Sequence, residues 1–429
     1  MKLFERLFKH ITLAFLLCFF APSTASSPNN EPTLQADSIE ISLLTCGPRQ
    51  QVYSLYGHTA IRFQDKQTGR DIAINYGVFS FDQPFFVLRF VFGLTDYEMG
   101  IAPFDIFEWE YGPTGCGVRQ QVLNLTAQEK MAIAQAVDRN MEPQNRVYRY
   151  NFFYDNCTTR ARDIIASNLN GRIVYDTSTP QHLNTSTPQH HNTPAQYPTF
   201  RNLIHNYNET HRWARFGNDL LLGVKADYNT TFEQQQFLPE RLCADFERAH
   251  IISADGTKRN LVSSSFWLFE PTTKQQSTQQ TNMSILDVFS PLVTFSILSI
   301  LTLIIAIVEY RRKRIIWVFD TSLMLTTGAC GLLLFAMIFS QHPTVSLNLQ
   351  ILLLNPINIF MLYSVTKAAR QNRIHWWTKA WSALILLLLA GSFLQSYAEG
   401  ITIVALSLLL RNISNIYTFK NTGSKQPEA

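Results

Sequence analysis

Residues 147–169 read VYRYNFFYDNCTTRARDIIASNL, and this stretch joins a predicted strand to a predicted helix at a cysteine. Residues 147–153 are predicted to form the strand. Asp155 and Asn156 are good N-cap residues, so we expect the helix to run from Cys157 to about residue 169. The sequence therefore predicts a cysteine in the first turn of a helix.

The predicted position of Cys157 favours a reactive thiol. The start of a helix carries unpaired N–H groups and the positive end of the helix dipole, which favour an anion. Such a position lowers the pKa of a thiol and makes the thiolate available as a nucleophile. The apolar residues Ala161, Ile164 and Ile165 of the same helix would pack on a core and hold the sulfur rigidly. A buried or disulfide-bonded cysteine is an equally good interpretation of this position alone.

A thiolate nucleophile needs a base, usually a histidine within hydrogen-bond distance. The candidate is His58 in the stretch LYGHTAIRF at residues 55–63, which we expect to be a strand from His58 onward. Side chains alternate along a strand, so His58 lies on the face opposite Ile61 and Phe63 and beside the small Ala60. A purely structural histidine is the alternative.

The remainder of this polar region, from about 33 to 270, predicts an α+β fold with an antiparallel sheet and a few helices. Thr126 and Glu129 form a capping box, which predicts a helix that ends near Met141. Besides the strands already named, we expect strands at residues 39–46, 71–79, 85–92 and 117–125.

The composition indicates two unlike parts. Of the 429 residues, 46 % are hydrophobic and only 16 % are charged, whereas ordinary globular domains carry about 25 % charged residues. The mean hydropathy of −0.03 is nevertheless too low for a chain that lies entirely within a membrane. These values exclude a disordered chain, a cytosolic globule and a compact transporter. The net charge of +4, without a basic stripe, argues against a nucleic-acid partner.

The apolar part lies near the C-terminus and predicts an all-α domain of five transmembrane helices. Each apolar stretch is near the roughly 20 residues that a membrane-spanning helix needs. The stretches lie at about 287–308, 315–339, 345–365, 379–395 and 400–418.

Lys and Arg gather after the first, third and fifth stretches, and the other two loops carry neither. By the positive-inside rule the polar domain is outside the cytoplasm. A basic start and an apolar run up to Ala21 predict a secretory signal peptide, in agreement with that orientation.

The predicted organisation has five parts. In chain order these are a signal peptide (1–25), an extracytoplasmic domain (33–270), a linker (271–284), the transmembrane domain (285–419) and a cytoplasmic tail (420–429). The extracytoplasmic domain contains a low-complexity insertion (176–196), in which an eight-residue stretch is almost duplicated. We interpret this duplication as a solvated loop, although its histidines would also suit a metal.

Two motifs carry a resemblance to known families. The order GHTAIR at 57–62 followed by NCTT at 156–159 resembles permuted NlpC-type, papain-like folds, including lecithin:retinol acyltransferase. The bacterial lipoprotein N-acyltransferase family Lnb is more similar, because it joins such a domain to five membrane helices. Further stretches that resemble Lnb lie at 151–160, 217–223, 237–239 and 355–358.

This resemblance implies that Cys157 is a thiol nucleophile and His58 its base. An acyl chain would pass from a phospholipid to Cys157 as a thioester and then to the N-terminal amine of a lipoprotein. It implies no cofactor and no metal, and a bacterial inner membrane location with the catalytic domain in the periplasm. Candidate substrate-binding residues, with Arg suited to lipid phosphate, are Tyr56, Arg62, Tyr154, Asn156, Arg160, His342 and Asn348. Tyr154, Asp155 and Asn156 are candidates for a third catalytic residue, which the sequence does not identify.

Two other functions compete with this interpretation. The same Cys–His pair would serve a membrane-tethered cysteine peptidase or amidase that acts on the cell wall. A non-catalytic envelope scaffold would instead hold Cys157 in a disulfide, and the even number of cysteines expected outside the cytoplasm favours pairing. These four are Cys46, Cys116, Cys157 and Cys243.

Two charged residues lie within predicted membrane helices. Asp320 in the second helix and Arg411 in the fifth should lie at similar depth near the cytoplasmic side. Because charges inside a membrane usually pair, we expect them to form an ion pair with a structural role.

Overall fold

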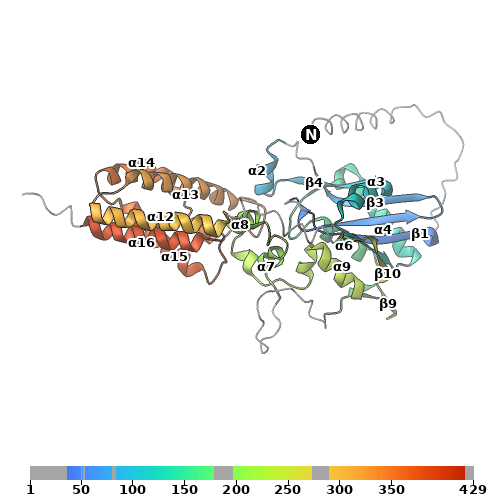
Figure 1. The fold of residues 1–429 in the computed structure, drawn as a ribbon. Coiled ribbons are helices and arrows are strands. Elements are labelled where there is room, and N and C mark those ends of the chain that lie inside the picture. The colour runs from blue at the N-terminus through green and yellow to red at the C-terminus, as the bar shows by residue number, and fades with distance from the viewer. Residues whose placement is uncertain are drawn as a thin grey trace, which may run out of the picture.

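The computed structural model describes two parts that lie end to end, a mixed α/β part and a helical bundle (Figure 1). The predicted signal peptide and the duplicated sequence lie outside the described residues, as do most of the predicted linker and tail. The described residues are 36–49, 51, 54–79, 84–177, 197–272 and 289–420.

A seven-stranded antiparallel sheet forms the centre of the mixed part, in the order β10-β5-β1-β2-β3-β4-β6. In chain order its strands are β1 (Ile39–Cys46), β2 (His58–Asp65), β3 (Arg70–Val78), β4 (Asp96–Pro103), β5 (Val118–Leu123), β6 (Val147–Arg149) and β10 (Val262–Phe269). The tight turn between β2 and β3 contains Gly69 with φ of +74°, a conformation that glycine adopts without steric cost. A second sheet consists of β7 (Arg172–Val174), β8 (His250–Ile252) and β9 (Lys258–Asn260).

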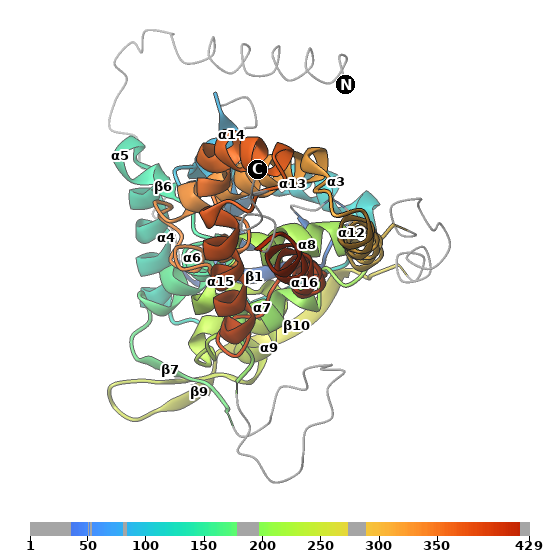
Figure 2. The same ribbon diagram turned by 90° about the vertical axis from the view of Figure 1, so that its left-hand side faces the viewer.

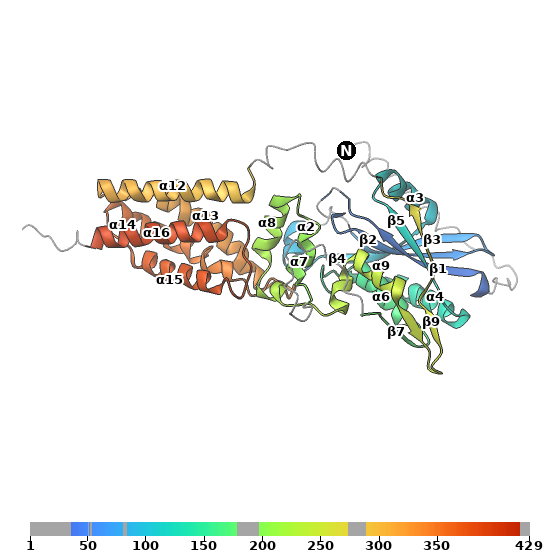
Figure 3. The same ribbon diagram turned by 60° about the horizontal axis from the view of Figure 1, so that its bottom comes forward.

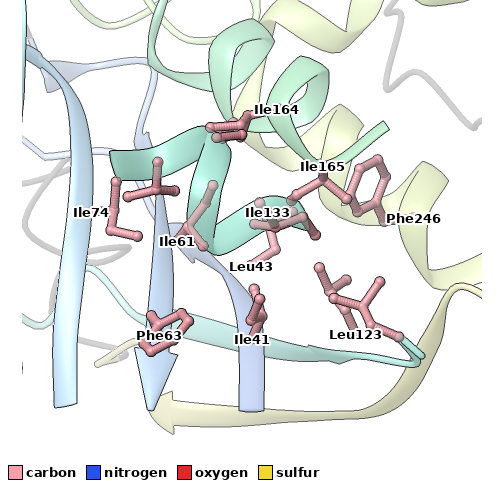
Figure 4. Close-up of a cluster of buried hydrophobic side chains, with 14 of the residues drawn as sticks. Ile41, Leu43, Ile61, Phe63, Ile74, Leu123, Ile133, Ile164, Ile165 and Phe246 are labelled. Carbon is pink, nitrogen blue, oxygen red and sulfur yellow. The ribbon is translucent and has the colours of Figure 1, made fainter. Parts of the chain in front are cut away.

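One face of the large sheet carries the main hydrophobic core. Helices α4 (Ala127–Met141), α6 (Cys157–Ala166) and α9 (Pro239–Arg248) cover this face. Figure 4 shows strand side chains such as Ile61 directed toward Ile165 of α6 and Phe246 of α9. The helix α4 begins with the predicted capping box and ends at Met141, as expected.

The other face is covered by α3 (Phe104–Tyr111), whose buried aromatic rings pack over the strands. Phe104, Phe107 and Tyr111 lie against Ala60 of β2 and Ala73 of β3. The small alanines leave room for these rings, so the face of β2 that carries His58 is covered as well. The mixed part also contains the α-helices α5 (Pro143–Arg146), α7 (Phe200–His205) and α8 (Arg212–Leu221), besides one that replaces a predicted strand.

The prediction of a strand at residues 85–92 was wrong, because the structure has helix α2 (Phe86–Val91) there. Their apolar and aromatic composition suits a strand, but β4 occupies the position beside β3 in the sheet. The segment therefore connects β3 to β4 and forms local hydrogen bonds, such as Phe92 N–H to the Leu88 carbonyl at 3.0 Å. The strand predicted at 147–153 is also shorter than expected, since it ends at Arg149.

The bundle contains five helices, and Figure 2 views them from the end that lies farther from the mixed part. They are α12 (Pro291–Arg312), α13 (Trp317–Met337), α14 (Ile357–Arg370), α15 (Trp376–Gly391) and α16 (Ile401–Lys420). Within the described residues, four apolar helical segments are long enough to cross a membrane, counting Leu349–Arg370 as the third. Helix α15 has 16 residues, which at about 1.5 Å per residue falls short of a hydrocarbon core of about 30 Å.

The third span is broken rather than continuous. A short 3₁₀ helix, η6 (Leu349–Leu352), precedes α14, and Asn355 and Pro356 separate the two. Gly331 of α13 packs directly on this break: a Cβ there would lie 2.5 Å from the Pro356 nitrogen. Close helix packing at a small residue is common in membrane domains.

Inside the bundle, Arg411 donates to Asp320 at 2.6 Å, which confirms the predicted ion pair. Arg411 also donates to Glu309 at 2.8 Å, and Asn415 donates to the other Glu309 oxygen at 2.9 Å. Sequence reasoning missed Glu309, because it stands directly before the basic residues that mark the cytoplasmic end of α12.

The mixed part is attached to the bundle through backbone contacts around α8 (Figure 3). Gly223 N–H donates to the Thr344 carbonyl and Val224 N–H to the Leu347 carbonyl, both at 2.8 Å. A Cβ on Gly223 would lie 2.0 Å from the Leu347 oxygen, so only glycine permits this approach. The 217–223 motif therefore joins the two parts of the molecule.

Candidate active site

The start of α6 is built by Asn156, which places Cys157 in the first helical turn as predicted. The Asn156 side-chain oxygen accepts from Thr158 N–H and Thr159 N–H, both at 2.9 Å. Its amide nitrogen donates to the carbonyl oxygens of Phe152 and Phe237. All side-chain groups of this buried residue are used, so Asn156 positions Cys157, and its contact with substrate stays a prediction.

His58, the first residue of β2, lies beside the sulfur of Cys157. Thr59 and Thr158, the residues that follow each of them, are joined by a hydroxyl–hydroxyl hydrogen bond of 3.1 Å. This contact brings the first residue of the strand to the first residue of the helix, although they are almost a hundred residues apart in sequence.

The contact with His58 activates the thiol. Burial raises the pKa of Cys157, but the charge of His58 and hydrogen bonds from His58 and the Thr59 N–H outweigh it and lower the pKa to about 7. Conversely, burial lowers the pKa of His58, while the Cys157 thiolate and hydrogen bonds to Cys157 and Asn75 raise it above its ordinary value. Each group therefore favours the charged form of the other, a thiolate beside an imidazolium.

This pairing predicts the pH dependence of thiol alkylation. The rate of reaction with iodoacetamide should rise with pH as the thiolate forms, with its midpoint at about 7. In His58→Ala the positive charge is gone while burial remains, so the midpoint should move upward. Mass spectrometry of the Cys157 peptide over pH 5–10 measures both midpoints. An unchanged midpoint in His58→Ala would contradict the pairing.

Asn75 of β3 is a site residue that sequence reasoning missed. Its side-chain oxygen lies 3.1 Å from His58 Nε2, and the His58 ring stacks on Tyr111 with 6.3 Å between ring centroids. An amide oxygen only accepts, so Nε2 carries the proton and Nδ1 is left for the sulfur. The pairing of β2 with β3 would have identified Asn75. It pairs with Ala60, which lies on the same face of β2 as His58.

Tyr148 is a second unanticipated residue beside Cys157. Its hydroxyl is buried and has no hydrogen-bond partner among the described residues. A Cβ on Gly77 would lie 3.8 Å both from this oxygen and from the Cys157 Cβ, so Tyr148 and Cys157 both adjoin Gly77. Burial raises the pKa of Tyr148, so the hydroxyl stays protonated and can donate.

Of the two predicted phosphate-binding arginines, Arg62 is occupied within the sheet. It donates to both carboxylate oxygens of Asp71, at 2.9 and 2.6 Å, and to Gln120 at 3.0 Å. These bonds join β2 to β3 and β5, so Arg62 has a structural partner, and its contact with a phosphate stays a prediction. Arg160 pairs with Asp155 at 2.6 Å and lies 3.6 Å over the Tyr148 ring, which places it at the site.

The remaining predicted binding residues lie around the junction of the two parts. Tyr56 accepts from Asn218 at 3.0 Å, and Tyr154 is 40 % exposed. His342 donates to the Phe90 carbonyl at 3.1 Å, and Asn348 donates to the Leu220 carbonyl at 2.7 Å. The buried Asn348 therefore joins the bundle to α8.

The cysteines of the described segments are free thiols, so the expected pairing is not observed. Cys157 is half-buried, whereas Cys46, Cys116 and Cys243 are buried. Burial raises the pKa of Cys46 and of Cys243, so Cys157 differs from them in having a lowered pKa. A scaffold that locks Cys157 in a disulfide is incompatible with this structure.

The fold and the site together define a class, a membrane protein whose extracytoplasmic α+β domain carries a thiol–imidazole pair. Two family models match the chain: the Lnb N-terminal periplasmic domain at residues 27–202 and the Lnb transmembrane domain at residues 280–422. The chain belongs to the Lnb family. Membership supports a membrane enzyme that modifies lipoproteins. Comparison with curated proteins and with solved structures found no significant match.

Proposed function

We propose that this protein is an acyltransferase of the bacterial inner membrane that moves an acyl chain from a phospholipid, through a thioester on Cys157, to the N-terminal amine of a lipoprotein. The observation that carries the proposal is a thiol with a pKa lowered to about 7 by His58, in a domain attached to the outer end of a membrane bundle. Such a thiol is a nucleophile at neutral pH.

In the first half-reaction the Cys157 thiolate attacks the ester carbonyl of the phospholipid. A carbon–sulfur bond forms and the carbonyl oxygen becomes an oxyanion. When the intermediate collapses, the ester carbon–oxygen bond breaks, and His58 gives its proton to the departing lysophospholipid alkoxide. Asn75 holds the imidazole in the tautomer that this transfer needs.

In the second half-reaction the α-amine of the lipoprotein attacks the thioester carbonyl. His58 takes a proton from the amine, the carbon–sulfur bond breaks, and the thiolate is regenerated. An amine needs an activated acyl donor, and a thioester is one. The product is an amide, and the enzyme returns to its starting charge state.

We assign the Tyr148 hydroxyl as a donor to the oxyanion of both half-reactions. The N–H groups of Thr158 and Thr159, which would otherwise point toward this charge, are bonded to Asn156. The buried Tyr148 hydroxyl has no hydrogen-bond partner among the described residues, and it lies against Gly77, as Cys157 does. A donor already directed at a developing charge lowers the barrier without reorganisation.

Tyr148→Phe should lower acyl transfer by about 10²–10³-fold, while alkylation of Cys157 by iodoacetamide stays at the normal rate. Alkylation forms no oxyanion, so the two measurements separate a catalytic donor from a merely structural ring. The ring and its contact with Arg160 are kept in the variant. Loss of both reactivities would instead mean that the hydroxyl supports the fold of the site.

The membrane domain favours this proposal over a cell-wall peptidase with the same pair. Both proposed substrates are anchored in the outer leaflet, so a site at the outer end of the bundle meets both within the membrane plane. A peptidase would use the bundle only as a tether. In this proposal Arg160 at the site and Tyr56, Tyr154 and His342 at the junction contact lipid headgroups, and the reaction needs no cofactor or metal.

The test is mass spectrometry of lipoprotein N-terminal peptides. A bacterial host that lacks its own N-acyltransferase should gain the mass of one acyl chain on these peptides when the protein is expressed. Unmodified peptides in the presence of the folded protein would refute the proposal. Cleavage of cell-wall peptides by the purified protein would favour the peptidase.

A further inference from the structure

The α2 segment, defined here as residues 84–94, exposes apolar side chains that no core requires. Phe85 is 77 % exposed, Leu88 52 % and Leu94 38 %. A contiguous patch of exposed apolar side chains marks a surface that contacts another protein or a membrane.

The position of the α2 segment indicates that the membrane is what its apolar surface contacts. Gln341 N–H donates to the Phe92 carbonyl at 2.9 Å, and His342 donates to the Phe90 carbonyl. These bundle residues directly follow the outer end of α13, where Phe339 is 68 % exposed. In Figure 1 α2 lies between the bundle and the sheet, so its exposed apolar side chains lie near the outer end of the membrane helices.

The charged residue of the segment is held apart from the apolar surface. Arg89 donates to the Leu94 carbonyl and, at 2.9 Å, to Asp96 at the start of β4. A paired guanidinium on an otherwise apolar segment suits the interface, where long basic side chains reach the headgroup region.

Both ends of the α2 segment lead to the site. On one side β3 ends just after Gly77, which lies against Cys157. On the other side β4 begins with Asp96 and Tyr97, and the Tyr97 ring lies beside the same Gly77 position. The two strands that flank the α2 segment therefore both reach the surroundings of Cys157.

We infer that the α2 segment lies in the outer leaflet and is the contact surface for the acyl chains of membrane lipids, which it guides to Cys157. Leaflet contact follows from the apolar surface alone. Delivery of the chain to Cys157 rests on the proposed function.

Leaflet contact is tested with an environment-sensitive fluorophore at Leu88→Cys in a Cys157→Ser, Cys330→Ala background, reconstituted in phosphatidylglycerol–phosphatidylcholine vesicles. The control is Ile106→Cys on α3, which is equally exposed at 52 % but lies far from the bundle in Figures 1 and 3. We expect a blue-shifted emission that nitroxide lipids quench at position 88 and not at 106. Equal emission and quenching at the two positions would overturn the inference.

Delivery is tested with the double variant Phe85→Asn, Leu88→Asn, with Ile106→Asn as control. Thioester formation from vesicle phospholipid should fall about tenfold or more in the double variant, while Cys157 still reacts with iodoacetamide. Unchanged thioester formation would overturn delivery. If the unmodified protein forms no thioester, the proposed function fails, and the fluorescence result still decides leaflet contact.

Discussion

Cys157→Ala should abolish the thioester and lower lipoprotein N-acylation by about 10⁴-fold or more, because catalytic groups that act as a unit cannot replace one another. The alanine side chain has no nucleophile, and water or the lipoprotein amine would have to attack an unactivated ester. His58→Ala should have a similar effect, since it removes the charge that lowers the pKa of the thiol and the group that moves the proton. N-terminal peptide mass spectrometry measures both losses.

The matched control is Cys330→Ala, which removes a thiol from α13 inside the bundle and should keep N-acylation. Protein abundance in the membrane fraction must be equal in all variants, so that lost activity is not lost protein. Full N-acylation by a folded Cys157→Ala variant would exclude the thioester route and leave the family assignment untouched.

The second large effect is on stability. Arg411→Met should lower the free energy of unfolding by about 3–5 kcal/mol, because it leaves two carboxylates in the bundle without their cation. Glu309 is fully buried and Asp320 is within 2.6 Å of the Arg411 guanidinium. Thermal unfolding in detergent, followed by helical circular dichroism, measures the change.

The control for this prediction is Lys367→Met, which removes an exposed positive charge near the end of α14 and should change stability little. The triple variant Arg411→Met, Glu309→Gln, Asp320→Asn should recover much of the loss, because no unpaired charge remains. If Arg411→Met alone were as stable as the unmodified protein, water would have to reach the carboxylates of Glu309 and Asp320.

The elements with strong local signals were predictable. Strand β1 begins and ends where expected, and the capping box at Thr126 and the N-cap at Asn156 begin helices as predicted. In each case residues within four positions carry the information. The prediction for the α2 segment failed for the opposite reason. Its composition favours a strand, but β4 already occupies the position beside β3.

The same distinction applies to the site. Cys157 and His58 were named from their local surroundings, and the structure brings them together, while their catalytic roles stay predictions. Asn75 and Tyr148 were missed because neither lies in a recognisable motif. Their relation to the pair depends on which strands are neighbours and on the backbone conformation at Gly77.

The sequence by itself determined the division into an extracytoplasmic α+β domain and a membrane bundle, its family and the two residues of the thiol–imidazole pair. Hydropathy, charge placement and helix capping are properties of short stretches, so they can be recognised from the sequence without a structure. Only the tertiary structure decided the tautomer of His58, the free hydroxyl of Tyr148, the occupation of Arg62 by Asp71 and the exposed surface of α2. Each depends on contacts between residues distant in sequence, which chain order alone does not specify.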